Sequence, residues 1–199
     1  DITFSLMYAF SENFVLPISH DEVVHMKGSL RGKMPGDDRQ QLAGVRAFTA
    51  YMLAHPGKKL TFMGAELGQW HEWDFASQLD WYLLENEENR RLHHFFKDIN
   101  RFYLSQSPLW DIDFSWEGFE WLDDNHNNVV VFLRRDRKGR ELIAAVNFSP
   151  VAQGEYRFGV PPKKIYREVF TTDCPEYGGT GEWMNESPIA VRPIPSHGR

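Results

Sequence analysis

The sequence predicts an α/β part of barrel type that is followed by an antiparallel β-sandwich. In residues 14–64 an apolar strand, an amphipathic helix and a second short apolar strand follow one another, an order typical of a parallel sheet. After Pro108 the pattern changes to short β-rich segments separated by polar turns, as in a sandwich. We therefore place a domain boundary near residues 106–113 and expect two domains, 1–108 and 109–199.

The first part is expected to alternate strands with helices. Residues 39–54 place apolar side chains at positions 42, 45, 48, 49, 52 and 53, and this helical spacing ends at His55-Pro56-Gly57. A later stripe that runs from Leu92 to Tyr103 has the same character. The predicted elements are a short helix or approach segment (1–13), a strand (14–18), a helix (39–54), a strand (60–64) and a helix (86–104).

The second part is expected to consist of strands alone. Its β-rich segments are separated by polar turns such as Arg137-Lys138-Gly139-Arg140. The predicted strands are Asn128–Arg134, Glu141–Phe148, Glu155–Val160, Ile165–Thr171 and Ile189–Arg192.

Composition excludes several classes of partner. The formal net charge of -6 argues against nucleic acid or an anionic membrane as the main partner. No apolar run approaches the roughly 18 residues that a membrane-spanning helix needs. A lone Cys174 cannot form an internal disulfide, which favours a reducing compartment such as the cytoplasm.

The strongest chemical signal is the cluster His20-Asp21-Glu22, which directly follows an apolar strand and Pro17. Polar residues at the carboxyl end of a barrel strand face the pocket. Three interpretations are open: a solvated strand end, a metal site, or a carboxylate of the glycosidase type. His20 and His25 are five residues apart, roughly 140° around a helix, which does not match the helical zinc pattern.

A resemblance to a known family decides between these interpretations. The stretch Asn13–His25 closely resembles the fourth conserved region of bacterial 1,4-α-glucan branching enzymes, which belong to the α-amylase superfamily. Two departures occur: Met26 stands where the family pattern has Gly, and Ala65-Glu66-Leu67 replaces Gly-Glu-Phe. The resemblance continues, in the family's order, through Gly28–Leu30, Gly32–Asp37, His55–Lys59, Phe62–Gln69, Glu72-Trp73 and Gln78–Trp81.

The resemblance implies a fold, a reaction and roles for residues. The first domain would hold the last strands and helices of a (β/α)8 barrel, and the second would be the C-terminal β-sandwich domain. Asp21 would stabilise the oxocarbenium-like transition state, and His20 would bind a sugar hydroxyl. Glu22 is at least as well explained as a supporting or surface acid. No cofactor and no metal are expected, and the substrate would be an α-glucan such as glycogen or amylose.

Further residues near the expected pocket rim are candidates for sugar binding. For each of them a role in loop packing is about as well supported as a sugar contact, although indole rings do stack on pyranose faces. These candidates are Glu66, Gln69, Trp73, Asp80 and Trp81.

The retaining mechanism of the family needs a nucleophile and an acid/base carboxylate. Both are expected upstream of residue 1, on earlier barrel strands, so the rest of that barrel is the expected partner and the chain alone is expected to be inactive. Two alternatives stay open: a related α-glucan hydrolase of the trehalosyl-maltooligosaccharide type, or a non-catalytic glucan-binding remnant. Residues 1–105 alone are expected to be poorly stable, because two strands of a parallel barrel leave unpaired edges.

Overall fold

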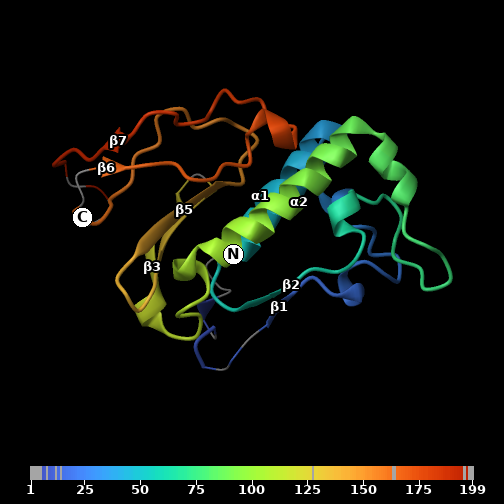
Figure 1. Ribbon diagram of the computed structural model, residues 1–199, viewed down its shortest axis with the longest axis horizontal. Coiled ribbons are helices and arrows are strands. Elements are labelled where there is room, and N and C mark those ends of the chain that lie inside the picture. The colour runs from blue at the N-terminus through green and yellow to red at the C-terminus, as the bar shows by residue number, and fades with distance from the viewer. Residues whose placement is uncertain are drawn as a thin grey trace.

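The structure is a computed structural model that describes residues 6–7, 9–11, 13, 15–126, 128–162, 165–194 and 196. Two long helices, α1 (Asp38–Ala54) and α2 (Glu87–Ser105), lie side by side in the middle of the molecule. In the view of Figure 1, β1 and β2 lie below the two helices, and the β-rich part with β3, β5, β6 and β7 lies to their left.

β1 (Val15–Pro17) and β2 (Lys58–Leu60) pair in parallel, with Val15 opposite Lys58, and α1 connects them. The predicted strand–helix–strand unit is therefore confirmed. The described residues hold this one pair of parallel strands and no closed barrel. Phe14, the predicted first residue of the strand, lies outside the described residues. The residues of the segment 1–13 that the structure describes lie mostly in turns.

The second strand differs from its prediction of residues 60–64, because it ends at Leu60. Gly64 has a φ of +94°, a left-handed conformation that an extended strand does not allow, and it starts a short turn of 3₁₀ helix. The apolar run Leu60–Met63 was typical of a buried strand, yet its last residues already belong to the loop that lines the candidate site.

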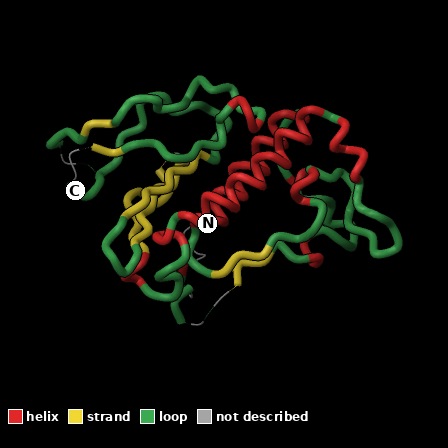
Figure 2. The backbone as a smooth tube through the Cα atoms, viewed as in Figure 1, coloured by secondary structure: helices red, strands yellow, loops and turns green. Residues whose placement is uncertain are grey.

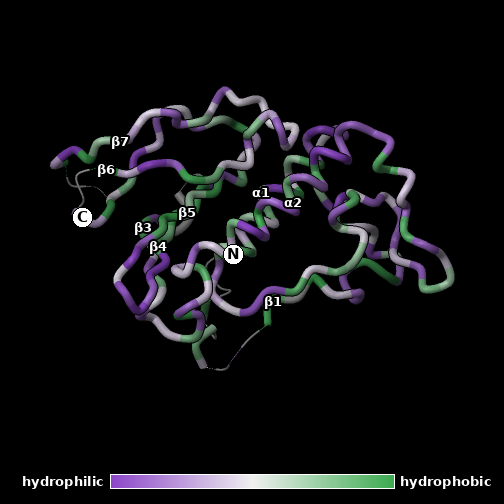
Figure 3. The backbone as a smooth tube through the Cα atoms, viewed as in Figure 1, coloured by the Kyte–Doolittle hydropathy of each residue, from purple (hydrophilic) through white to green (hydrophobic). Residues whose placement is uncertain are grey.

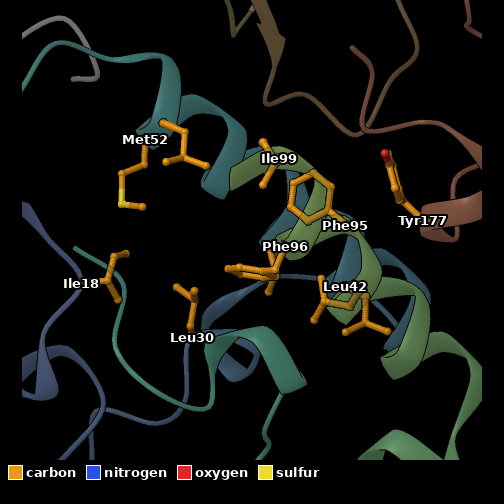
Figure 4. Close-up of a cluster of buried hydrophobic side chains, with 11 residues drawn as sticks. Ile18, Leu30, Leu42, Met52, Phe95, Phe96, Ile99 and Tyr177 are labelled. Carbon is orange, nitrogen blue, oxygen red and sulfur yellow. The ribbon is translucent and has the colours of Figure 1, made fainter. Parts of the chain in front are cut away.

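Both helices match their predictions within one residue. Asp37 caps α1 through a reciprocal capping box with Gln40, and Asn86 caps α2. Hydrophilic and hydrophobic residues alternate along both helices (Figure 3), and their apolar faces meet in the main core (Figure 4). The buried residues of that core are Ile18, Leu30, Leu42, Val45, Met52, Leu53, Leu92, Phe95, Phe96, Ile99 and Tyr177.

The β-rich part contains two antiparallel sheets. β4 (Val129–Arg135) lies between β3 (Phe119–His126) and β5 (Glu141–Asn147). A second sheet joins only β6 (Ile165–Tyr166) and β7 (Ile189–Ala190), and long loops make up most of this end (Figure 2). Turns of 3₁₀ helix occur at His20–Glu22, Arg31–Lys33, Ala65–Leu67, Trp81–Glu85, Ser107–Leu109, Trp116–Gly118 and Pro175–Tyr177.

The strand predictions after residue 108 were partly wrong. The segment 155–160 forms no strand, although Tyr156, Phe158 and Val160 do pack against the core of β3 and β4. Its alternation therefore reports a half-buried face on a segment that does not pair as a strand. The predictions 165–171 and 189–192 shrink to two residues each.

β3 was missed because its pattern is irregular. The register with β4 shifts between Trp121 and Asp123 and again between Asp124 and His126. Such bulges break the strict alternation that identifies a half-buried strand in a sequence.

A buried ion pair joins the helical part to the β-rich part. Arg134 of β4 donates to Asp113 (Nη2–Oδ1, 2.7 Å) and to the carbonyl oxygen of Ala54 at the end of α1 (2.6 Å). Lys58 of β2 donates to the other carboxylate oxygen of Asp113 at 3.0 Å. We refer to Ala54, Lys58, Asp113 and Arg134 as the junction; it fixes β2 and α1 relative to the β-rich part.

Candidate functional site

The candidate site lies where the parallel strands end. The loops that follow the carboxyl ends of β1 and β2 meet there, because Trp73 donates its backbone N–H to the carbonyl oxygen of Val23 at 2.9 Å. The sequence therefore brings the His20-Asp21-Glu22 turn next to the segment that contains Glu72 and Trp73. Carboxyl ends of parallel strands are where α/β proteins place their ligand sites.

His20 and Asp21 form a solvent-facing pair. The imidazole Nε2 lies 3.2 Å from Asp21 Oδ1, and the two side chains are 54% and 69% exposed. Ser19 caps the turn by accepting the Asp21 N–H at 3.3 Å, and Lys27 Nζ donates to the Asp21 carbonyl at 2.7 Å. The carboxylate thus stays open to a ligand while its backbone is held.

An aromatic wall stands beside His20. The ring of Phe62 lies 6.1 Å and the ring of Trp73 lies 6.4 Å from the imidazole, and these two rings meet edge to face at 5.2 Å. Both aromatic residues line a shallow cavity together with Ile18 and Val23. His20 and Asp21 lie beside this cavity and do not line it.

The carboxylates at positions 22 and 66 lie differently from each other. Glu22 is exposed at the end of its turn. Glu66 is half-buried and accepts the backbone N–H of Gly64 at 3.0 Å, so it stabilises its own loop. That contact supports the loop-packing interpretation of Glu66 more than a sugar contact.

Gln69, Asp80 and His71 close the loop after β2. The Gln69 side chain accepts the N–H of Asp80 at 3.3 Å and donates to the carbonyl of His71 at 3.3 Å. Asp80 Oδ2 lies 3.1 Å from His71 Nδ1. Gln69 and His71 line the cavity, whereas Trp81 lies on the following 3₁₀ turn, 52% exposed and away from the cavity lining.

Arg31, His71 and Phe62 lie at the site but were not among the predicted site residues. The guanidinium of Arg31 is buried and stacks on the Trp70 ring at 4.0 Å, and burial lowers the pKa of Arg31. Its position in a Gly-rich loop gave no signal for this contact. Phe62 was predicted to lie within the strand 60–64, where an apolar side chain is expected to pack in the core.

The loop after β2 is held to the helices. Gly68 (φ +65°) lies so close to Leu42 and Leu92 that a Cβ there would be 3.0 Å from each side chain. Asn89 of α2 donates to the carbonyl of Leu67 at 2.7 Å. Both helices therefore position the cavity wall.

The described part of the chain offers no metal site and no membrane-spanning helix. Within it, no cluster of three or more His, Cys, Asp or Glu side chains is arranged to hold a metal ion. None of its helices combines the length and the apolar character that crossing a membrane requires.

Comparison with known proteins identifies the family. Residues 121–199 match the model of the alpha amylase C-terminal all-beta domain. The chain is 53% identical to the 1,4-alpha-glucan branching enzyme of Aquifex aeolicus over an alignment of 201 residues. That alignment covers 100% of this chain and 32% of the Aquifex aeolicus protein. The chain belongs to the bacterial 1,4-α-glucan branching enzyme family.

Two other branching enzymes support this assignment. That of Aromatoleum aromaticum is 49% identical over 99% of the chain and 31% of its own length. That of Rubrobacter xylanophilus is 50% identical over 100% of the chain and 28% of its own length. The chain thus spans about a third of the length of the branching enzymes that it matches.

Among solved structures, a cyclomaltodextrinase matches 67% of the chain and 20% of its own length, with 20% identity and a TM-score of 0.45. The family model begins within β3 and includes β4 to β7, so the antiparallel sheets lie in the region that is similar to the alpha amylase C-terminal all-beta domain.

Proposed function

We propose that this chain is part of a 1,4-α-glucan branching enzyme, which cleaves an α-1,4-glucan and transfers the segment to a glucan 6-hydroxyl. The observation that carries the proposal is the similarity of about 50% identity over the whole chain. The position of His20 and Asp21 at the ends of a parallel strand pair supports it.

Membership of this family also implies an architecture for the chain. β1 and β2, with α1 and α2, would be the last strands and helices of a (β/α)8 barrel in domain 1–108, and residues 109–199 would form a β-sandwich domain. The rest of the barrel would pair with the free edges of β1 and β2. The parent enzyme would act in the cytoplasm on glycogen or amylose-like chains.

Asp21 would stabilise the positive charge that develops on the sugar ring, and His20 would orient that ring. As the glycosidic bond breaks, the sugar ring gains positive charge, and an ionised carboxylate beside it stabilises that transition state more than the ground state. The His20 imidazole, held beside Asp21, would bond to a sugar hydroxyl and fix the ring. No step requires a metal or a cofactor.

The bond-making steps would use two further carboxylates of the parent enzyme. One would attack the anomeric carbon and form a glycosyl ester while the other protonates the departing oxygen. The second would then accept the proton of an incoming 6-hydroxyl, which attacks the ester and forms the α-1,6 bond. Phe62 and Trp73 would form an apolar wall against the sugar faces, and Trp81 would serve a more distant unit.

An assay of the full-length polypeptide that contains this chain tests the proposal. Amylose should lose its iodine stain without a matching rise in reducing ends, and a debranching enzyme should release the new chains. Reducing ends that rise in step with the loss of stain would instead show a hydrolase. The Asp21→Asn variant should lose about a thousandfold in kcat/KM, the size of one strong electrostatic contribution.

The chain by itself should show no branching, because we place the nucleophile and the acid/base outside it. Its Trp-rich loops raise a second function, glucan binding without catalysis. Retardation of the chain in a native gel that contains glycogen would support that function, and unchanged mobility would exclude it.

A further inference from the structure

The loop that follows Asp21 has an unusual backbone. His25 and Met26 have φ values of +57° and +68°, and Gly28 has +76°. Residues other than Gly, Asn and Asp rarely adopt this left-handed backbone conformation, because their Cβ atom comes too close to the carbonyl oxygen. Met26 is 96% exposed, so packing of its side chain does not offset the strain. Another part of the molecule must hold this loop.

Glu72 makes the contact that can do so. Its Oε1 accepts the backbone N–H of Gly28 at 2.7 Å across 44 residues of sequence. Hydrogen bonds from the backbone of Gly28 and then of Met26 lower the pKa of Glu72. A carboxylate that accepts the Gly28 N–H holds the loop at the end of its left-handed residues, His25, Met26 and Gly28.

The same loop also contacts the backbone of Asp21. Lys27, the residue before Gly28, donates its Nζ to the Asp21 carbonyl at 2.7 Å. The Trp73 N–H binds Val23 O directly after Glu72. Contacts from residues 72 and 73 therefore hold both ends of the 23–28 loop, and a shift of that loop would shift the Asp21 turn.

We propose that Glu72 is a positioning residue, which holds the 23–28 loop in its left-handed conformation and thereby fixes Asp21 and His20. This inference rests on the proposed function for its kinetic consequence, but its structural consequence stands alone. Met26 makes it testable, because glycine adopts the left-handed conformation without strain. Met26→Gly should therefore reduce the dependence of the loop on Glu72.

The first measurement is hydrogen exchange on the 199-residue chain. Glu72→Ala should speed exchange of the Gly28 and Met26 amides by about tenfold, the effect of losing a charge-assisted hydrogen bond. Glu72→Gln keeps an acceptor and should give a smaller change. Asp74→Ala is the matched control, because the Asp74 carboxylate accepts hydrogen bonds from Ala76 and Ser77 of its own turn; it should leave the 23–28 loop unchanged.

The second measurement is kinetics in the full-length polypeptide. Glu72→Ala should lower kcat on amylose about tenfold with KM nearly constant and an unchanged midpoint of thermal unfolding. The double variant Glu72→Ala, Met26→Gly should recover at least about a third of the lost kcat.

The outcomes separate the possibilities. A rise in KM alone would show that Glu72 binds glucan directly, and unchanged amide exchange in Glu72→Ala would show that it does not hold the loop; either result overturns the proposal. If the full-length polypeptide has no branching activity, the proposed function fails, while the exchange measurement still decides whether Glu72 holds the loop.

Discussion

The His20–Asp21 pair at the end of β1 and the Arg134–Asp113 pair at the junction differ in their exposure. The His20 and Asp21 side chains are 54% and 69% exposed, while those of Arg134 and Asp113 are 0% and 1% exposed. A charge in water can meet a ligand, whereas a charge removed from water must be satisfied by the protein itself. The comparison separates a pair that is available for chemistry from one that belongs to the architecture.

The surroundings of the two pairs agree with this division. Arg134 donates to three backbone carbonyls, those of Ala54, Ile112 and Gly118, besides Asp113. Asp21 has a hydrogen-bonded backbone, while its carboxylate faces solvent beside His20. The junction can therefore be broken only at a cost in folding, whereas the site can be changed at a cost in activity.

The largest effect is expected at the junction. Arg134→Met leaves the Asp113 carboxylate buried without its main partner and should lower the free energy of unfolding by about 3–5 kcal/mol. Urea denaturation of the chain, followed by tryptophan fluorescence, measures this loss.

Two controls test the cause. Arg157→Ala removes an arginine from an exposed pair with Glu155 and should change stability by less than about 0.5 kcal/mol. The double variant Arg134→Met, Asp113→Leu removes both buried charges and should recover much of the loss. If the double variant is no more stable than Arg134→Met alone, the buried charge is not the cause.

A smaller effect is expected from His55, which is buried beside the junction. Burial lowers the pKa of His55 to about 4 from 6.5, helped by the nearby charges of Lys59 and Arg134. In the unfolded chain His55 therefore binds a proton below about pH 6.5, whereas in the folded chain it binds one only below about pH 4. The free energy of unfolding should therefore decrease as the pH is lowered through this window, by about 2 kcal/mol between pH 7 and pH 5.

Urea midpoints at pH 7 and pH 5 measure this slope. His55→Gln should flatten it, and His93→Gln, at an exposed position of α2, should leave it as in the original chain. An equally steep fall in the His55→Gln variant would assign the pH dependence to other groups.

The two regions also differ in how far the sequence predicts them. Helices α1 and α2 are visible because their caps and apolar stripes are local. The His20-Asp21 turn is equally local, since a strand, a proline and the polar cluster follow one another, and the family resemblance then assigns its chemistry. The junction joins residues 21 and 80 positions apart, and nothing near Asp113 or Arg134 in the sequence indicates that they meet.

Within the site the same limit applies. Trp73 was predicted near the pocket and lines the cavity, while Trp81 does not, because the chain enters a 3₁₀ turn at that residue. Glu72 was noted only as part of a motif, since its contact with Gly28 spans 44 residues. Long-range contacts of this kind come from tertiary packing, which periodicity and capping signals do not contain.

The smallest effect on stability is expected at the proposed catalytic carboxylate. Asp21→Asn in the chain should change the free energy of unfolding by less than about 0.5 kcal/mol, because solvent screens its pair with His20. The Ser19 cap and the Lys27 contact both engage the Asp21 backbone and survive the substitution. Urea denaturation at pH 7 measures the change, with Arg157→Ala as the reference for an exposed pair. A loss near that of Arg134→Met would place Asp21 with the junction and remove the distinction between the two pairs.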